Sequence, residues 1–191
     1  SALSLSALPP ADGSVVCGES KIPEAHKKIH RVKLFPEHVE AVQSSLDALR
    51  DAEAIVLGPG SLYTSIMPNL LVEGIGDALC RSKAVKIYIC NVMTQPGETD
   101  GYTASMHVKA ILDHAGRNAV DYVIVNSTPV PEDLKKKYAE AGAYPVIVDE
   151  DVLKALGVGV IKADLITAHD AIHHDPKKLA ESVMQVVYET M

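Results

Sequence analysis

A cluster of hydroxyl side chains directly after a glycine–proline–glycine turn is the first feature of the sequence that could bind a ligand. Residues 58–65 read G-P-G-S-L-Y-T-S and follow Ala54–Leu57, an apolar run with the length of a buried strand. Glycines let the backbone approach a ligand, and the N–H groups and dipole of a helix start attract phosphate. An ordinary turn with capping hydroxyls has the same composition, and neither G-x-x-x-x-G-K-S/T nor G-x-G-x-x-G is matched. The stretch therefore predicts a phosphate site or a capped turn.

A second polar segment, residues 91–101, follows an apolar run at 85–90 and carries amide, hydroxyl and carboxylate groups. Amides can read sugar or base edges through paired donors and acceptors. Glu98 and Asp100 could hold Mg²⁺, which prefers a few carboxylates together with phosphate oxygens. The alternative is that Asp100 caps the following helix and that Glu98 is solvated.

Histidines near the C-terminus are dense enough to suggest a metal site. His169, His173 and His174 lie close to Asp170 and Asp175. Their spacing is not H-E-x-x-H, and adjacent histidines cannot share a helix face. We therefore expect them to be mostly surface residues.

Three further features also have simple structural explanations. His107 lies on an expected helix, where packing or exposure is more common than catalysis. Tyr138 falls at helical spacing from Leu134, so core packing competes with ligand stacking. Lys135 and the two lysines after it are expected to form a solvated face.

Composition and charge narrow the class of protein. The chain has 191 residues, 47% hydrophobic and 4% aromatic, with a net charge of −7. These values fit one domain with an aliphatic core, and they disfavour binding to nucleic acid or to an anionic membrane surface. Three cysteines without C-x-x-C spacing indicate reduced thiols. No apolar run approaches the ~18 residues of a membrane span, and residues 1–8 lack a signal peptide's basic flank. We expect a cytoplasmic protein.

The alternation of apolar and amphipathic segments predicts an α/β fold with a mostly parallel sheet and helices on both faces. Strands are expected within residues 1–11 and at 14–17, 30–35, 54–57, 85–90, 122–125, 146–148 and 159–163. Helices are expected from Pro36, over 70–81 and 102–114, and from Pro131, with a loop at 18–23. Two further helices are expected after the caps Asp149 and Asp175, the second with Pro176 at its first position.

In such a fold, ligands bind beyond the carboxyl ends of the strands, at a point where the strand order switches. Residues 58–65, 91–101 and 126–131 each follow an apolar strand, so these loops are expected there. Asn91 comes directly after a buried strand, where we expect it to contact a ligand or to brace the loop.

Two of these loops resemble a known family. G-P-G-S-L-Y-T-S-I-M-P-N-L-L at residues 58–71 and Y-I-C-N-V-M-T-Q-P-G-E-T-D-G-Y-T at 88–103 closely resemble the YvcK-like gluconeogenesis factors of the CofD-like group. G-E-S-K-I-P at 18–23 and P-V-I-V-D at 145–149 also fit, and the similarity extends from about residue 13 to the C-terminus. The resemblance implies a Rossmann-like three-layer sandwich.

The resemblance also implies a ligand and its binding residues. YvcK-like proteins are similar to binders of UDP-sugars, notably UDP-N-acetylglucosamine, and are implicated in gluconeogenic growth and cell shape without an established reaction. CofD itself transfers a phospholactyl group from a nucleotide-activated donor to a deazaflavin precursor. The matching ligand-binding positions are Gly58, Gly60, Ser61, Tyr63, Thr64 and Asn69 on one wall, Asn91, Thr94, Gln95 and Glu98 on the other, and Tyr138. We add Ser65 as the last hydroxyl of the first loop.

Two departures from the family pattern affect phosphate binding. The family usually opens with a G-G-G-T-G strand–turn–helix, which this sequence does not contain, so we expect residues 1–191 to form a single CofD-like domain without that element. The family often reads R-H-D where residues 173–175 read H-H-D. His173, which we include among the ligand-binding residues, therefore replaces a guanidinium with an imidazole that is mostly neutral at pH 7.

Three functions from different classes follow. The first is a regulatory factor that binds a nucleotide sugar and acts through self-association or through cell-wall or carbon-metabolism proteins, because the loops contain no evident nucleophile–base pair. The second is a CofD-type phospho- or nucleotidyl-transferase that needs a divalent metal such as Mg²⁺ near Glu98 or Asp100. The third is an interaction scaffold with a vestigial site. No catalytic residue is assigned, and no cofactor is certain.

Overall fold

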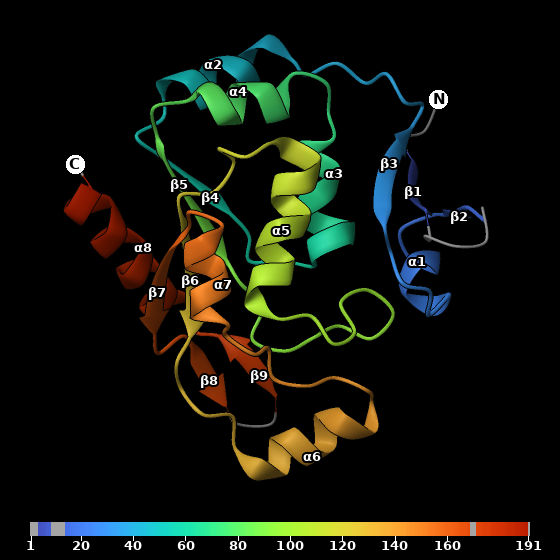
Figure 1. Ribbon diagram of the computed structural model, residues 1–191, viewed down its shortest axis with the longest axis vertical. Helices are drawn as coiled ribbons and strands as arrows, with labels where there is room; N and C mark the ends of the chain where they lie inside the picture. The colour runs from blue at the N-terminus through green and yellow to red at the C-terminus, as the bar shows by residue number, and fades with distance from the viewer. Residues whose placement is uncertain (1–3, 9–13, 169–170, 191) are drawn as a thin grey trace.

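A four-stranded parallel sheet forms the centre of the structure, a computed structural model that describes residues 4–8, 14–168 and 171–190 (Figure 1). Every neighbouring pair of strands is parallel, as expected. The spatial order equals the sequence order, so the described strands contain no reversal and the expected switch point is not found among them. The strands are β4 (Ala54–Leu57), β5 (Val85–Ile89), β6 (Tyr122–Asn126) and β7 (Gly159–Ala163).

Helices cover both faces of this sheet, which confirms the α/β fold. Side chains alternate between the faces of a strand. Tyr88 therefore packs in the core that includes α5 (Ala104–Ala115) and α7 (Glu150–Ala155), whereas Ile87 packs with α8 (Pro176–Thr190). Right-handed crossovers between strands in sequential order put α5 and α7 on the same face. The opposite face is left to α8, which follows the last of these strands.

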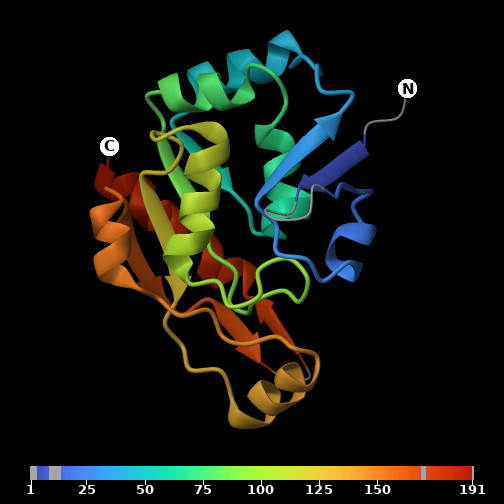
Figure 2. The same ribbon diagram turned by 45° about the vertical axis from the view of Figure 1, so that its right-hand side comes forward.

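A smaller antiparallel sheet lies beside α3 and α5 (Figure 2). Its order is β2 (Val16–Cys17), β1 (Ser4–Leu8) and β3 (Arg31–Phe35). The strands expected at 14–17 and 30–35 are confirmed. Of the strand expected within residues 1–11, positions 1–3 and 9–11 lie outside the described residues. The loop expected at 18–23 is wrong in part, because α1 (Lys21–Glu24) forms there.

The small sheet and α1, which connects two of its strands, each contact the main body. The backbone N–H of Val32 donates to Nε2 of His114 on α5, at 3.2 Å. Gly97, in the loop after β5, has φ +78° and lies so close to Pro23 that an added Cβ would overlap the Pro23 carbonyl oxygen. The loop after β5 is therefore packed directly against α1.

The helices around β4 differ from the prediction. The helix expected at 70–81 is confirmed over 75–81, as α4 (Ile75–Arg81), and is wrong before Gly74, where a π-helical segment (Leu62–Ile66) continues into α3 (Met67–Leu70). Gly74 has φ +91°, a left-handed conformation that interrupts a helix. The helix expected from Pro36 begins later, as α2 (Gln43–Asp51), which packs on α4 and has no buried residue.

The start of α5 is capped by different side chains than expected. Thr103, not Asp100, occupies the N-cap, and its hydroxyl accepts a hydrogen bond from the Met106 N–H at 3.4 Å. Asp149, expected to cap α7, makes no such bond there. Its carboxylate instead accepts from the backbone N–H of Ser105 at 2.9 Å and from the Ser105 hydroxyl.

The strand expected at 146–148 is wrong, although this segment does pair locally. It forms isolated bridges, Pro145 with Met93 and Ile147 with Thr103. The segment therefore runs beside the loop after β5 without extending the sheet.

A hairpin that the sequence did not predict follows β7. Its strands are β8 (Ile166–Ala168) and β9 (Ile172–His174), and His169 and Asp170 lie outside the described residues. Figures 1 and 2 place this hairpin and α6 (Glu132–Glu140) beyond the carboxyl ends of the parallel strands. Asp175 caps α8, as expected, and accepts from the Lys177 N–H at 2.9 Å. Within the described ranges, no helix has the length and apolarity to cross a membrane.

Candidate functional site

The loops that follow β4 and β5 contact each other directly. The side-chain amide of Gln95 donates to the Ser61 hydroxyl at 2.7 Å. The Thr64 hydroxyl donates to Glu98 at 2.8 Å, and the Tyr63 backbone N–H donates to the second carboxylate oxygen at 3.3 Å. Neighbouring parallel strands thus bring the two loops together, as their position in the sequence predicted.

Glu98 occupies the place predicted for a phosphate. Only 7% of the residue is exposed, and its carboxylate faces the backbone N–H of Tyr63 and the hydroxyl of Thr64, both within the Leu62–Ile66 segment. Burial raises the pKa of Glu98, and the hydrogen bonds from Thr64 and Tyr63 oppose that rise. Two donors that follow the turn after β4 are therefore already used by a carboxylate of the protein itself.

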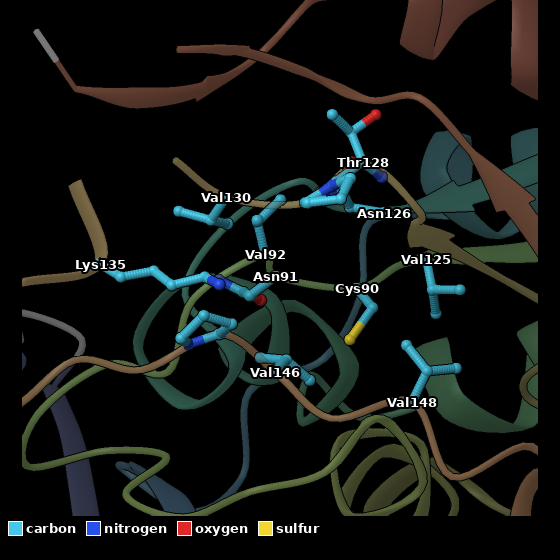
Figure 3. Close-up of a pocket in the computed structure, with 12 residues that line it drawn as sticks. Cys90, Asn91, Val92, Val125, Asn126, Thr128, Val130, Lys135, Val146 and Val148 are labelled. Carbon is cyan, nitrogen blue, oxygen red and sulfur yellow. The ribbon is translucent and has the colours of Figure 1, made fainter. Parts of the chain in front are cut away.

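Two adjoining cavities, which we call the crevice, lie beyond the carboxyl ends of β5 and β6. The smaller has a volume of about 220 Å³ and lies between the two strand ends and the segment 145–148 (Figure 3). The larger, about 500 Å³, extends from the loop after β5 to α6 and β9. Asn91 and Val92 line both cavities. Five of the predicted ligand-binding residues line the larger cavity: Asn91, Thr94, Gln95, Glu98 and Tyr138.

Several polar side chains of the crevice are already hydrogen-bonded within the protein. The Asn126 amide donates to the Thr128 carbonyl at 2.7 Å and accepts from the Leu165 N–H at 3.2 Å. The Thr94 hydroxyl accepts from the Tyr144 N–H at 2.9 Å. The Tyr138 hydroxyl accepts from the backbone N–H of Ile172 at 3.1 Å, which leaves its own proton to donate.

Two buried polar atoms that belong to crevice residues have no hydrogen-bond partner in the described structure, Oδ1 of Asn91 and Nε2 of His174. Burial lowers the pKa of His174, and a hydrogen bond with the Cys90 backbone opposes this, so the imidazole is neutral at pH 7. A buried polar atom without a partner costs about 1–3 kcal/mol, and such atoms mark places for water or a ligand. The two other unpartnered atoms, on Tyr88 and His107, belong to side chains buried in the core.

His174 lines the crevice, and the sequence did not identify it as a ligand-binding residue. Its neighbour His173, which was predicted, is exposed and does not line either cavity. Successive side chains of a strand point to opposite sides, so only one of two adjacent histidines on β9 can face the crevice. Recognising β9 as a strand would have shown that the two differ, but the tertiary position of the hairpin decides which one faces inward.

The predicted residues of the first loop are not on the opposite wall of the crevice. Gly58, Ser65 and Asn69 line a separate cavity of about 310 Å³ at the end of β4. Gly60 lies against Ser65, since an added Cβ would come within 3.3 Å of the Ser65 Cβ. The remaining members of the loop make the contacts with the second loop described above: Ser61, Tyr63 and Thr64. A ligand-binding role for this group stays a prediction.

The two carboxylates suggested for Mg²⁺ both make hydrogen bonds inside the protein. Asp100 accepts from the Gly97 N–H at 2.7 Å, and Glu98 is bonded as described above. Across residues 4–8, 14–168 and 171–190, no cluster of three or more His, Cys, Asp or Glu is arranged to hold a metal. His107 is fully buried, with Nδ1 2.8 Å from the Thr103 carbonyl, so it serves packing. A Mg²⁺ site near Glu98 or Asp100 stays a prediction, and a metal there would compete with the hydrogen bonds that these carboxylates already accept.

Comparison with known proteins identifies the family. Residues 3–166 match the family model described as 2-phospho-L-lactate transferase CofD. Because this match covers most of the chain, the chain belongs to the CofD family, as the two loops indicated.

Curated relatives and solved structures agree with this assignment. The chain is 52% identical over 175 residues to a gluconeogenesis factor of Halalkalibacterium halodurans, and the aligned region covers 91% of this chain and 54% of that protein. It is 48% identical over 179 residues to the gluconeogenesis factor of Bacillus subtilis, covering 93% and 56% respectively. A crystal structure of a Bacillus halodurans protein superposes with a TM-score of 0.92 at 50% identity, covering 96% of this chain and 59% of that one. The chain therefore spans little more than half the length of these relatives.

Proposed function

We propose that this chain binds a UDP-sugar such as UDP-N-acetylglucosamine in the crevice and acts as a regulatory factor in gluconeogenic growth and cell shape. The observation that carries the proposal is the pair of unpartnered atoms on crevice residues, Asn91 Oδ1 and His174 Nε2. Sugar hydroxyls and an acetamido N–H are donors that would satisfy such acceptors. The name of relatives at 48% and 52% identity, gluconeogenesis factor, supports the physiological role.

A CofD-type phospho- or nucleotidyl-transferase is the second candidate, and the description of the matching family favours it. Such a reaction depends on positioning and on neutralising phosphate charge, usually with a divalent metal. We prefer the regulatory role because both carboxylates suggested for the metal, on Glu98 and Asp100, accept hydrogen bonds within the protein. Ligand binding would then regulate cell-wall or carbon metabolism through self-association of the chain or through protein partners.

Calorimetric titration with UDP-N-acetylglucosamine, with and without Mg²⁺, followed by phosphorus NMR, separates the two candidates. Saturable binding that leaves the ligand unchanged is the result we expect. Release of UMP or UDP only when Mg²⁺ is present would replace the regulatory proposal with the transferase. No binding and no turnover would contradict both and leave a scaffold role.

A further inference from the structure

A nucleotide ligand brings negative charge into the crevice, and the described residues offer little to neutralise it. Among the described residues that line the two cavities, Lys135 is the only Lys or Arg, and Glu98 is the only Asp or Glu. The whole chain has a net charge of −7, so its general field repels an anion. Any attraction for phosphate must therefore come from a local group.

Lys135 is placed to supply that attraction. It lies on α6 and lines the smaller cavity, and Figure 3 shows its side chain extending toward Asn91. Its ammonium group lies 2.6 Å from a carboxylate oxygen of Glu132, and this pair is solvent-accessible, with side chains 37% and 78% exposed. Exposed ion pairs are weak, so a phosphate can replace Glu132 as the partner of Lys135. Lys136, the next residue, is exposed and lines neither cavity.

We propose that Lys135 binds the phosphate groups of the nucleotide, exchanging its ion pair with Glu132 for them. This inference rests on the proposed function and orients the ligand within the crevice. The phosphates lie at the α6 side of the smaller cavity. The larger cavity, whose described lining contains no Lys or Arg, holds an uncharged part of the ligand.

Titration of the full chain with UDP and with uridine at low ionic strength tests the proposal. Replacing Lys135 with Met weakens UDP binding about tenfold, because a charge-assisted contact is lost, and leaves uridine binding unchanged. The matched control Lys136→Met leaves both unchanged. Glu132→Gln removes the competing carboxylate and tightens UDP binding roughly two- to fivefold, more than its neighbour Asp133→Asn does.

Each contrary result has a distinct meaning. If UDP binds the native chain and Lys135→Met binds it equally well, the role of Lys135 is overturned while the proposed function stands. Equal weakening by Lys136→Met and Lys135→Met also overturns it, because the effect would then be the charge of the whole helix. If neither UDP nor UDP-N-acetylglucosamine binds the native chain, both proposals fail. If Lys135→Met does not fold, Glu132→Gln provides the test: tighter UDP binding supports the role of Lys135, and unchanged UDP binding overturns it.

Discussion

The loop after β4 and the crevice after β5 and β6 occupy equivalent places in the parallel sheet, yet they use their polar groups differently. The first loop directs its donors at Glu98, an anion from the second loop. The second region has buried acceptors without a partner, on Asn91 and His174. Residue types suited to a ligand were present in both regions. The difference shows that the same residue types can be used in internal hydrogen bonds in one region and left without a partner in another.

The largest effect on stability is expected where the loop after β5 approaches α1 closely, at Gly97. Replacing Gly97 with Ala puts a Cβ into the Pro23 carbonyl at a positive φ, so we expect the free energy of unfolding to fall by about 3 kcal/mol or more in urea denaturation. Gly101 is the control, because it has φ +69° but open space around it. Its Ala variant should lose about 1 kcal/mol. Equal losses would show that the approach to Pro23 is not tight.

Removing the internal anion tests whether the first loop depends on it. Glu98→Ala leaves the Tyr63 N–H and the Thr64 hydroxyl without their acceptor, and we expect unfolding free energy to fall by about 2–3 kcal/mol. Glu98→Gln keeps one acceptor oxygen and should lose less. Chemical denaturation followed by circular dichroism measures both. An alanine variant as stable as the native chain would mean that the loop holds its shape without the carboxylate.

The comparison between the two regions becomes sharper when one asparagine is removed from each. Asn91→Ala should weaken the binding free energy of UDP-N-acetylglucosamine, measured by calorimetry, by about 1–3 kcal/mol, because a buried hydrogen bond to the ligand is lost. Asn69→Ala, in the cavity at the end of β4, should leave the affinity unchanged. The reverse result would move the ligand to the first loop and remove Asn91 from the site.

The smallest expected effect is a change of stability with pH at the contact between the small sheet and α5. The helix α1, which lies between two strands of this sheet in the chain, contributes Pro23 to the crevice. Burial lowers the pKa of His114, and its neutral Nε2 accepts from Val32. Since an unfolded His titrates near 6.5, this stability is present above about pH 6.5 and is lost as pH falls through the lower folded pKa. We expect a loss on the order of 1 kcal/mol, measured by urea denaturation against pH.

A glutamine at position 114 provides the comparison for this pH effect, because its amide oxygen can accept from Val32 without titrating. The His114→Gln variant should therefore show a flatter dependence of stability on pH. His38→Gln, at a side chain that is 91% exposed, is the control and should keep the native dependence. Identical pH dependence in the native chain and the His114 variant would rule out this imidazole as the cause.

Much of the fold could be predicted because its signals are local. The short apolar run at Ala54–Leu57 and the Asp175-Pro176 cap each depend on neighbouring residues, and both are confirmed. The hairpin of β8 and β9 was missed because its strands are only three residues long. The strand expected at 146–148 failed for a related reason: its apolar residues pack beside a loop instead of joining the sheet.

The site divides in the same way. The sequence by itself determined the family, the α/β fold and the importance of the two polar loops. These signals depend on residues that are neighbours along the chain, so they can be read without a structure. Only the tertiary structure decided that Glu98 fills the first loop, that His174 rather than His173 lines the crevice, and that Lys135 reaches it. Such pairings join residues far apart along the chain, and whether a polar group is free depends on partners that only folding brings within hydrogen-bond distance.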